Sequence, residues 1–205
     1  MTIELTPAIA FGGDAYCGKD TAANFLVKEY GYKRLAFGDP LKVEAFDQLF
    51  SPDQDFIVFM HRNRQMEDAY RACHRETGAY VPALSTRAEK IDWINENKVV
   101  LRKYLQLYGT EYRRRQDPDY WVNLAASQCH PGERYVFTDY RFENEGLLAL
   151  ALGGFRCIVR RPGLKKQGVE GHDSEKSELL PREVDIWNTS TLEILRRFVL
   201  ALARV

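Results

Sequence analysis

Hydrophobic and polar positions near the start of the chain alternate between strand-like and helix-like patterns. The apolar run 7–12 predicts a strand, and apolar residues at helical spacing within 22–30 predict a helix that ends at the following glycine. Residues 32–37 predict a second short strand, and the next helix is expected to have Asp39 as its N-cap. Two strand–helix units are therefore predicted to open the chain.

Strand signals fade over residues 56–128, where three segments carry helical patterns: 60–74, 91–108 and 121–129. Thr86 and Glu89 have the spacing of a capping box ahead of the second segment. This stretch is predicted to be a helical insertion.

Strand and helix patterns alternate again in the last third of the chain. Strands are predicted at 134–138, 155–159 and 184–187, and a helix at 143–152. Ser190, with Glu193, is predicted to cap a final helix with one apolar face formed by Leu192, Leu195, Phe198, Val199 and Leu202. Alternation of this kind predicts an α/β fold with a parallel sheet covered by helices on both sides.

The 205 residues suit one domain. We expect a core formed by residues 1–50 and 130–205, a helical substrate-binding insertion at about 51–129, and a lid loop at about 161–179. The last segment follows a predicted strand, is polar and shows no periodicity, which is typical of a lid; a disordered surface loop is the alternative.

Composition and charge narrow the classes of partner. The chain is 45% hydrophobic, and its 29 basic residues balance 29 acidic ones, so it has no overall field for binding nucleic acid. It has neither a basic n-region followed by an apolar segment nor an apolar run of the roughly 20 residues that a membrane helix needs. We therefore expect a cytoplasmic globular protein. Its four cysteines and four histidines lack the spacing of a zinc site.

The strongest chemical signal is a glycine-rich loop between the first strand and the first helix. It matches G-x-x-x-x-G-K and consists of Gly13, Asp14, Ala15, Tyr16, Cys17, Gly18, Lys19, Asp20 and Thr21. The glycines allow successive backbone N–H groups to face one phosphate group, and Lys19 adds a cation. The loop predicts ATP binding.

Asp20 stands where the motif usually has serine or threonine, and a hydroxyl follows at Thr21. Asp20 or Thr21 is expected to hold Mg²⁺, through water in the case of Asp20. The alternative is that Asp20 is an acidic residue of the first helical turn, favoured by the helix dipole.

Beyond this loop, four further blocks carry a resemblance that runs almost end to end: LAFGDPLK at 35–42, LQLYGTE at 105–111 with DYWV at 119–122, TDYRFENE at 138–145, and VRRPG at 159–163 with HDSE at 172–175. In this order they resemble the T-even type deoxynucleoside monophosphate kinases of tailed bacteriophages. The resemblance implies phosphorylation of deoxynucleoside monophosphates with ATP and Mg²⁺. It also implies a P-loop nucleoside monophosphate kinase fold with a core, a helical substrate-binding part and a mobile lid.

Phosphoryl transfer brings several negative charges together, and arginines are suited to clamp them. Arg141 follows a predicted strand and is expected at the carboxyl edge of the sheet, where open α/β folds bind ligands. Asp139 beside it would order Mg²⁺-bound water or orient Arg141. A local surface ion pair is the alternative.

The resemblance places an arginine for the acceptor phosphate in the run Arg113–Arg115 and favours Arg114, although a solvated basic face is the alternative. The other acceptor-side candidates are Phe37, Asp39, Lys42, Gln106, Thr110 and Trp121. Trp121 is favoured to stack on the base over Phe37, Tyr104 and Tyr120, with a place in the core as the alternative for all four, and Gln106 is expected to bind the base edge. Arg160 or Arg161 is expected to close over the ATP phosphates, and Asn188 to contact adenine.

The predicted activity is transfer of the ATP γ-phosphate to a deoxynucleoside 5′-monophosphate. A kinase of another small acceptor, such as dephospho-coenzyme A, is one alternative. A protein that phosphorylates hydroxymethylated bases in phage DNA, or another DNA-bound P-loop module, is the second, and the charge balance argues against it. The sequence leaves the base preference open and the oligomeric state as well, with a homodimer among the options.

Overall fold

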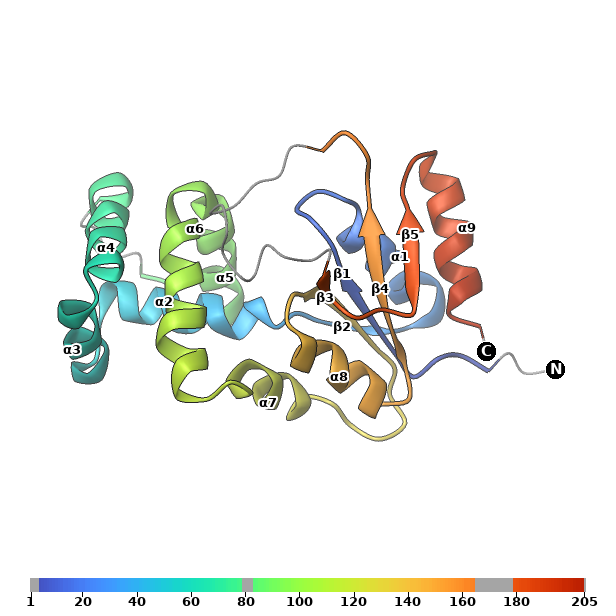
Figure 1. The fold of residues 1–205 in the computed structure, drawn as a ribbon, viewed down its shortest axis with the longest axis horizontal. Coiled ribbons are helices and arrows are strands. Elements are labelled where there is room, and N and C mark those ends of the chain that lie inside the picture. Colours follow the sequence, from blue (N-terminus) through green and yellow to red (C-terminus); the bar gives the residue numbers. More distant parts are fainter. Residues whose placement is uncertain (1–3, 79–82, 165–178, 205) are drawn as a thin grey trace. The chain divides into compact units, whose positions relative to one another are not determined.

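The computed structural model describes residues 4–78, 83–164 and 179–204. Five strands form one sheet in the order β2-β3-β1-β4-β5, and every pairing in it is parallel. Their bounds are β1 (Ala8–Gly12), β2 (Lys33–Leu35), β3 (Tyr135–Tyr140), β4 (Phe155–Arg160) and β5 (Val184–Trp187). Figure 1 shows the sheet with its helices, which confirms the predicted α/β class.

The helices are α1 (Lys19–Tyr30), α2 (Gly38–Phe50), α3 (Gln54–Arg62), α4 (Arg64–Thr77), α5 (Arg87–Glu96), α6 (Lys98–Leu107), the π-helix η1 (Tyr108–Arg114), α7 (Tyr120–Ala126), α8 (Glu143–Ala151) and α9 (Leu192–Leu202). The chain folds into two compact units, residues 1–37 with 122–205, and residues 38–121. The second unit begins earlier than residue 51 because α2 packs against α5 and α6. It also ends before residue 129, since the division falls within α7.

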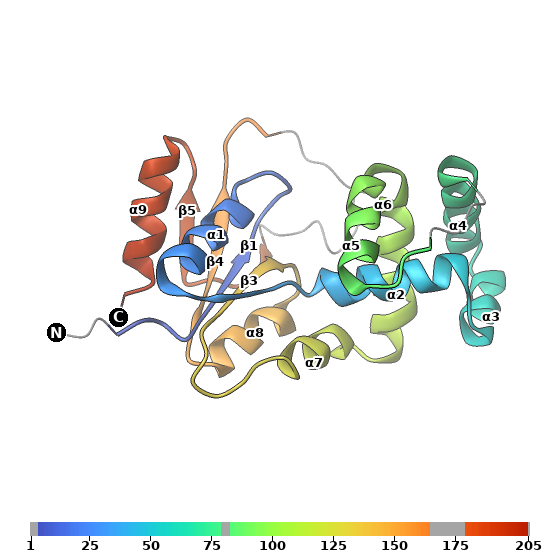
Figure 2. The same ribbon diagram turned by 180° about the vertical axis from the view of Figure 1, so that it is seen from behind.

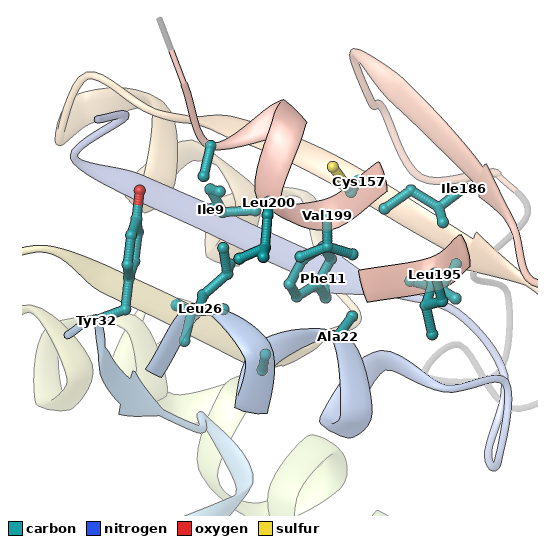
Figure 3. Close-up of a cluster of buried hydrophobic side chains, with 14 of the residues drawn as sticks. Ile9, Phe11, Ala22, Leu26, Tyr32, Cys157, Ile186, Leu195, Val199 and Leu200 are labelled. Atoms are coloured by element: carbon teal, nitrogen blue, oxygen red, sulfur yellow. The ribbon is translucent and has the colours of Figure 1, made fainter. Parts of the chain in front are cut away.

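In the first unit, one face of the sheet is covered by α1 and α9. Ile9 and Phe11 of β1 pack with Leu26 of α1 and Val199 of α9 in a buried cluster (Figure 3). Strand residues alternate between the two faces, so the neighbours of Ile9 and Phe11 point to the opposite face. Because these side chains lose nearly all contact with water, the cluster fixes α1, and with it the end of the glycine loop, against the sheet.

The other face of the sheet is covered by α8, which contacts β1, β3 and β4. Gly146 allows this approach, since a Cβ there would meet the Tyr140 ring at 2.8 Å and Arg156 Cδ at 2.6 Å. Figure 2 shows the same elements from behind. The central strands β1, β3 and β4 are therefore buried on both faces, as strands of parallel sheets usually are.

The second unit has a core rich in aromatic side chains. Phe56 of α3 lies with ring centroids 5.5 Å from Tyr108 and 5.2 Å from Tyr112. Tyr104 is fully buried and donates to the Ala45 carbonyl at 2.9 Å, which joins α6 to α2. This packing holds the helices of the unit around η1.

Four sequence predictions on helices were wrong. The predicted helical segment 60–74 falls on two helices, because Asn63 ends α3 and caps α4. The predicted helix at 91–108 is two helices, because Asn97 between them leaves the helical region at φ −96°, ψ 10°. Asp39 lies in the first turn of α2 and not before it. The N-cap of α9 is Thr191, whose hydroxyl accepts from the Ile194 N–H at 3.3 Å, and not Ser190.

The apolar face predicted for α9 is corrected in part. Leu195 and Val199 are buried, whereas Leu192 and Phe198 are exposed at 61% and 47%. The Thr86–Glu89 capping box of α5 is confirmed. Among the described residues, no helix combines the length and apolar character needed to cross a membrane.

Candidate functional site

The glycine loop lies where the sequence predicts it, between the carboxyl end of β1 and the first turn of α1. Gly13 and Gly18 have φ of 130° and 110°, and Tyr16 between them has φ 63°. Glycine adopts such angles readily, whereas a tyrosine there is uncommon. Gly18 is the N-cap residue of α1 and has no side chain, so it makes no side-chain cap hydrogen bond to the first turn of the helix.

Both glycines are also required by space. A Cβ on Gly13 would collide with the Val159 carbonyl oxygen of β4, and one on Gly18 would lie 2.5 Å from the Asn188 amide nitrogen. Asn188 donates from that nitrogen to the Cys17 carbonyl at 2.9 Å. The segment after β5 thus holds the glycine loop, a contact the sequence did not reveal.

Lys19 begins α1 and is 7% exposed, with Nζ donating to the Asp14 carbonyl at 2.8 Å. The lysine therefore closes the loop on itself and keeps its ammonium group beside the loop backbone. Cys17 is buried, and burial raises the pKa of its thiol. A thiol held neutral in this way packs as a small apolar side chain.

Asp20 and Thr21, the two side chains expected to hold Mg²⁺, differ in exposure and contacts. Asp20 is 71% exposed at the side chain and lies 3.5 Å from the Arg34 guanidinium. Thr21 follows it in α1 and is partly buried. Over residues 4–78, 83–164 and 179–204, no group of three or more His, Cys, Asp or Glu side chains is placed to hold a metal ion. Their role in metal binding stays a prediction.

The segment after β3 is fixed by carboxylates. Asp139 Oδ1 accepts the Phe37 N–H at 2.8 Å, which ties the end of β3 to the residues after β2. Buried Glu145 of α8 accepts the N–H groups of Arg141 at 2.7 Å and Phe142 at 3.1 Å. Arg141 thus lies just beyond β3, at the carboxyl edge of the sheet, as predicted.

Phe37 is buried and stacks on Phe137, with ring centroids 5.2 Å apart, so its ring belongs to the packing of the first unit.

The two consecutive arginines at the end of β4 have different surroundings. Arg160 Nε pairs with Asp185 Oδ1 at 2.6 Å, and the Arg160 guanidinium carbon lies 5.7 Å from the Trp187 ring centroid. Arg161 is exposed. The predicted lid at 161–179 falls mostly on 165–178, which are outside the described residues.

In the second unit, a carboxylate not identified from the sequence gathers three side chains. Glu44 of α2 accepts from Arg113 Nε at 2.9 Å, from the Tyr108 hydroxyl at 3.1 Å and from the Tyr120 hydroxyl at 2.8 Å. Burial raises the pKa of Tyr120, as does its hydrogen bond to Glu44. No short motif marks this cluster, because its members come from α2, η1 and α7.

The neighbouring acceptor-side candidates have other contacts. Arg114 donates from Nη1 to the Pro118 carbonyl at 2.9 Å, and Arg115 pairs with Glu111 at 2.9 Å while 72% exposed. Lys42 pairs with Asp39 at 3.0 Å in the first turn of α2.

Trp121 is 2% exposed and donates its indole N–H to the Gly109 carbonyl at 3.1 Å. Gly109 lies in η1, where a Cβ would collide with the Leu41 side chain. Thr110 is also in η1, and Gln106 in α6; both are partly buried. Trp121 therefore supports the π-helix, and its stacking on a base stays a prediction.

No family model matches the chain. A protein of Acanthamoeba polyphaga mimivirus named "Putative deoxynucleotide monophosphate kinase" is 24% identical over 186 residues, which are 90% of this chain and 90% of that protein. Among solved structures, dephospho-CoA kinase from Campylobacter jejuni aligns with a TM-score of 0.42 and 14% identity, over 95% of this chain and 94% of the other. The fold class rests on the parallel sheet and the loop after β1, seen in this chain itself.

Proposed function

We propose that this chain is a nucleotide kinase that transfers the γ-phosphate of ATP to a deoxynucleoside 5′-monophosphate. The observation that carries the proposal is the glycine loop, with Gly13 and Gly18 at positive φ and Lys19 buried at the start of α1. The similarity to the mimivirus protein, over nine-tenths of both chains, supports the choice of acceptor. Its product would be a deoxynucleoside diphosphate, which supplies nucleotides for DNA synthesis.

The donor would be held by the first unit. Phosphate oxygens accept hydrogen bonds from backbone N–H groups that a glycine loop and a helix N-terminus present together. Lys19 would exchange its bond to the Asp14 carbonyl for the transferring phosphate. Mg²⁺, held through Asp20 or Thr21, would neutralise phosphate charge when bound.

Other residues of the first unit would align the donor. Arg141 and Asp139, at the carboxyl edge of β3, would act on the transferring group. Arg161 would contact the ATP phosphates. For Asn188, its bond to the Cys17 carbonyl favours holding the loop over reading adenine.

Residues of the second unit would bind the acceptor, among them Asp39, Lys42, Gln106, Thr110, Arg114 and Trp121, and Phe37 of the first unit is the remaining candidate. The acceptor phosphate itself is the nucleophile, so transfer needs alignment and charge neutralisation and no covalent intermediate.

The test measures ADP release with a coupled assay. The acceptors are each of the four common deoxynucleoside monophosphates, a hydroxymethyl analogue and dephospho-coenzyme A. We expect release that depends on a deoxynucleoside monophosphate and a kcat about 10²-fold lower in Lys19→Ala, the scale of losing one preorganised electrostatic contact. Lys28→Ala, an exposed lysine in the last turn of the same helix, is the matched control and should retain activity. Release with dephospho-coenzyme A alone would move the function to that acceptor.

A further inference from the structure

Arg113, Arg114 and Arg115 lie at the end of η1, and the contacts of Arg113 differ from those of the other two. Its Nε donates to Glu44 at 2.9 Å and to the Tyr108 hydroxyl at 3.1 Å. Its guanidinium carbon lies 5.0 Å from the Tyr112 ring centroid and 5.1 Å from that of Tyr120. The side chain is 21% exposed, so it is packed on several sides and still reaches water.

The two Nη groups of Arg113 have no hydrogen-bond acceptor among the residues that the structure describes, since both of its side-chain hydrogen bonds use Nε. A guanidinium presents its Nη groups as a planar fork that matches two oxygens of a phosphate. In Arg113 this fork is immobilised before any ligand binds, which lowers the entropy that binding costs.

The carboxylate that holds Arg113, that of Glu44, accepts hydrogen bonds at both of its oxygens. Glu44 Oε2 accepts from Arg113 and Tyr108, and Oε1 accepts from Tyr120. Hydrogen bonds from three donors disperse the negative charge of Glu44, which reduces its repulsion of an anion bound to the fork. Burial alone would lower the pKa of Arg113, but Tyr108 and Glu44 outweigh this effect and raise it.

The backbone at Arg113 is also unusual. η1 is a π-helix, and π-helical turns are rare and frequently lie at functional sites. Gly109 and its Trp121 hydrogen bond accommodate the wider turn. The π-helical turn sets the position of Arg113 beside Glu44, and Arg114 instead donates to the Pro118 carbonyl.

We propose that Glu44 is a positioning residue that holds Arg113 as a preformed fork for the phosphate of the acceptor nucleotide, with Tyr108 and Tyr120 supporting the pair. This inference rests on the proposed function. It assigns the acceptor phosphate to Arg113, where the sequence favoured Arg114.

The experiment measures KM for one purine and one pyrimidine monophosphate, dGMP and dTMP, KM for ATP, kcat and the unfolding midpoint in four variants. Arg113→Lys keeps the charge and loses the fork, and should raise KM for both monophosphates at least about tenfold while KM for ATP stays within twofold. Glu44→Gln, which keeps the size of the side chain, should raise the same KM values about three- to tenfold. The double variant should be no worse than Arg113→Lys alone, because Glu44 acts through Arg113.

Arg71→Ala is the matched control, since Arg71 is an ion-paired arginine of the same unit, 2.6 Å from Glu67 and 67% exposed. It should leave every kinetic constant unchanged. If Arg113→Lys lowers the unfolding midpoint and leaves KM for both monophosphates within twofold of wild type, the cluster is only an ion pair between helices and the inference is wrong.

Binding of dGMP and dTMP by titration calorimetry separates this inference from the proposed function. If the wild type phosphorylates neither monophosphate but binds one, and Arg113→Lys loses that binding, the phosphate fork stands and the kinase proposal fails. If the wild type is active and Arg113→Lys binds and turns over both monophosphates normally, the kinase proposal stands and the fork is refuted.

Discussion

Replacing Gly18 by alanine tests how the glycine loop is held. Gly18 has φ 110°, and a Cβ there would lie 2.5 Å from the Asn188 amide nitrogen, which bonds to the Cys17 carbonyl. The substitution therefore imposes two separate costs. One is backbone strain at Gly18, and the other is displacement of the Asn188 amide.

The two costs have different sizes. A left-handed backbone angle costs a residue with a Cβ roughly 1–2 kcal/mol. Moving Asn188 costs its hydrogen bond, about 1 kcal/mol. Gly18→Ala should therefore lower the free energy of unfolding by about 2–3 kcal/mol in the wild type, and by about 1–2 kcal/mol where Asn188→Ala has already removed the bond. The expected coupling between the two positions is about 1 kcal/mol.

Urea unfolding followed by circular dichroism measures all four members of this double-mutant cycle. Gly31→Ala is the control, because Gly31 has φ 68° and a Cβ there would meet nothing within 4 Å. Its cost should be the strain alone and should be the same with and without Asn188. If Gly18→Ala costs the same in both backgrounds, within about 0.3 kcal/mol, Asn188 does not hold the loop and the reasoning fails.

Three further changes probe other parts of the molecule. Burial raises the pKa of Tyr32 to about 12. The stability that its neutral phenol contributes is therefore complete below about pH 10 and is lost as the pH rises toward 12. In Tyr32→Phe, unfolding midpoints measured over that range should fall less steeply than in the wild type. Trp121→Phe removes the donor to the Gly109 carbonyl and should cost about 1–3 kcal/mol in urea unfolding, whereas a higher KM for the monophosphate at unchanged stability would indicate base stacking instead. Thr86→Ala removes the side-chain cap of α5 and should cost about 1 kcal/mol, seen as a lower urea midpoint; an unchanged midpoint would contradict the cap.

The sequence predicted the sheet and the glycine loop because both depend on local patterns. Strand β5 lies at 184–187 as expected, since a short segment with Val184, Ile186 and Trp187, followed by turn residues, specifies it. The errors lie where tertiary contacts decide. Residues 91–108 have one continuous helical pattern, yet the chain turns at Asn97, and α5 and α6 pack on each other.

The two candidate binding regions differ in how far apart their residues lie along the chain. The glycine loop is one contiguous segment, so its chemistry follows from order and spacing alone. Glu44 instead meets partners 64, 69 and 76 positions away, and Asn188 reaches Cys17 from 171 positions away. A motif search detects the groups of the loop that we propose to contact phosphate, but the side chains that hold those groups in place become visible only when the helices are packed. Glu44 and Asn188 lie outside every motif. Substitutions at these two positions should therefore distinguish an effect on the stability of the fold from an effect on the position of Arg113 or of the glycine loop.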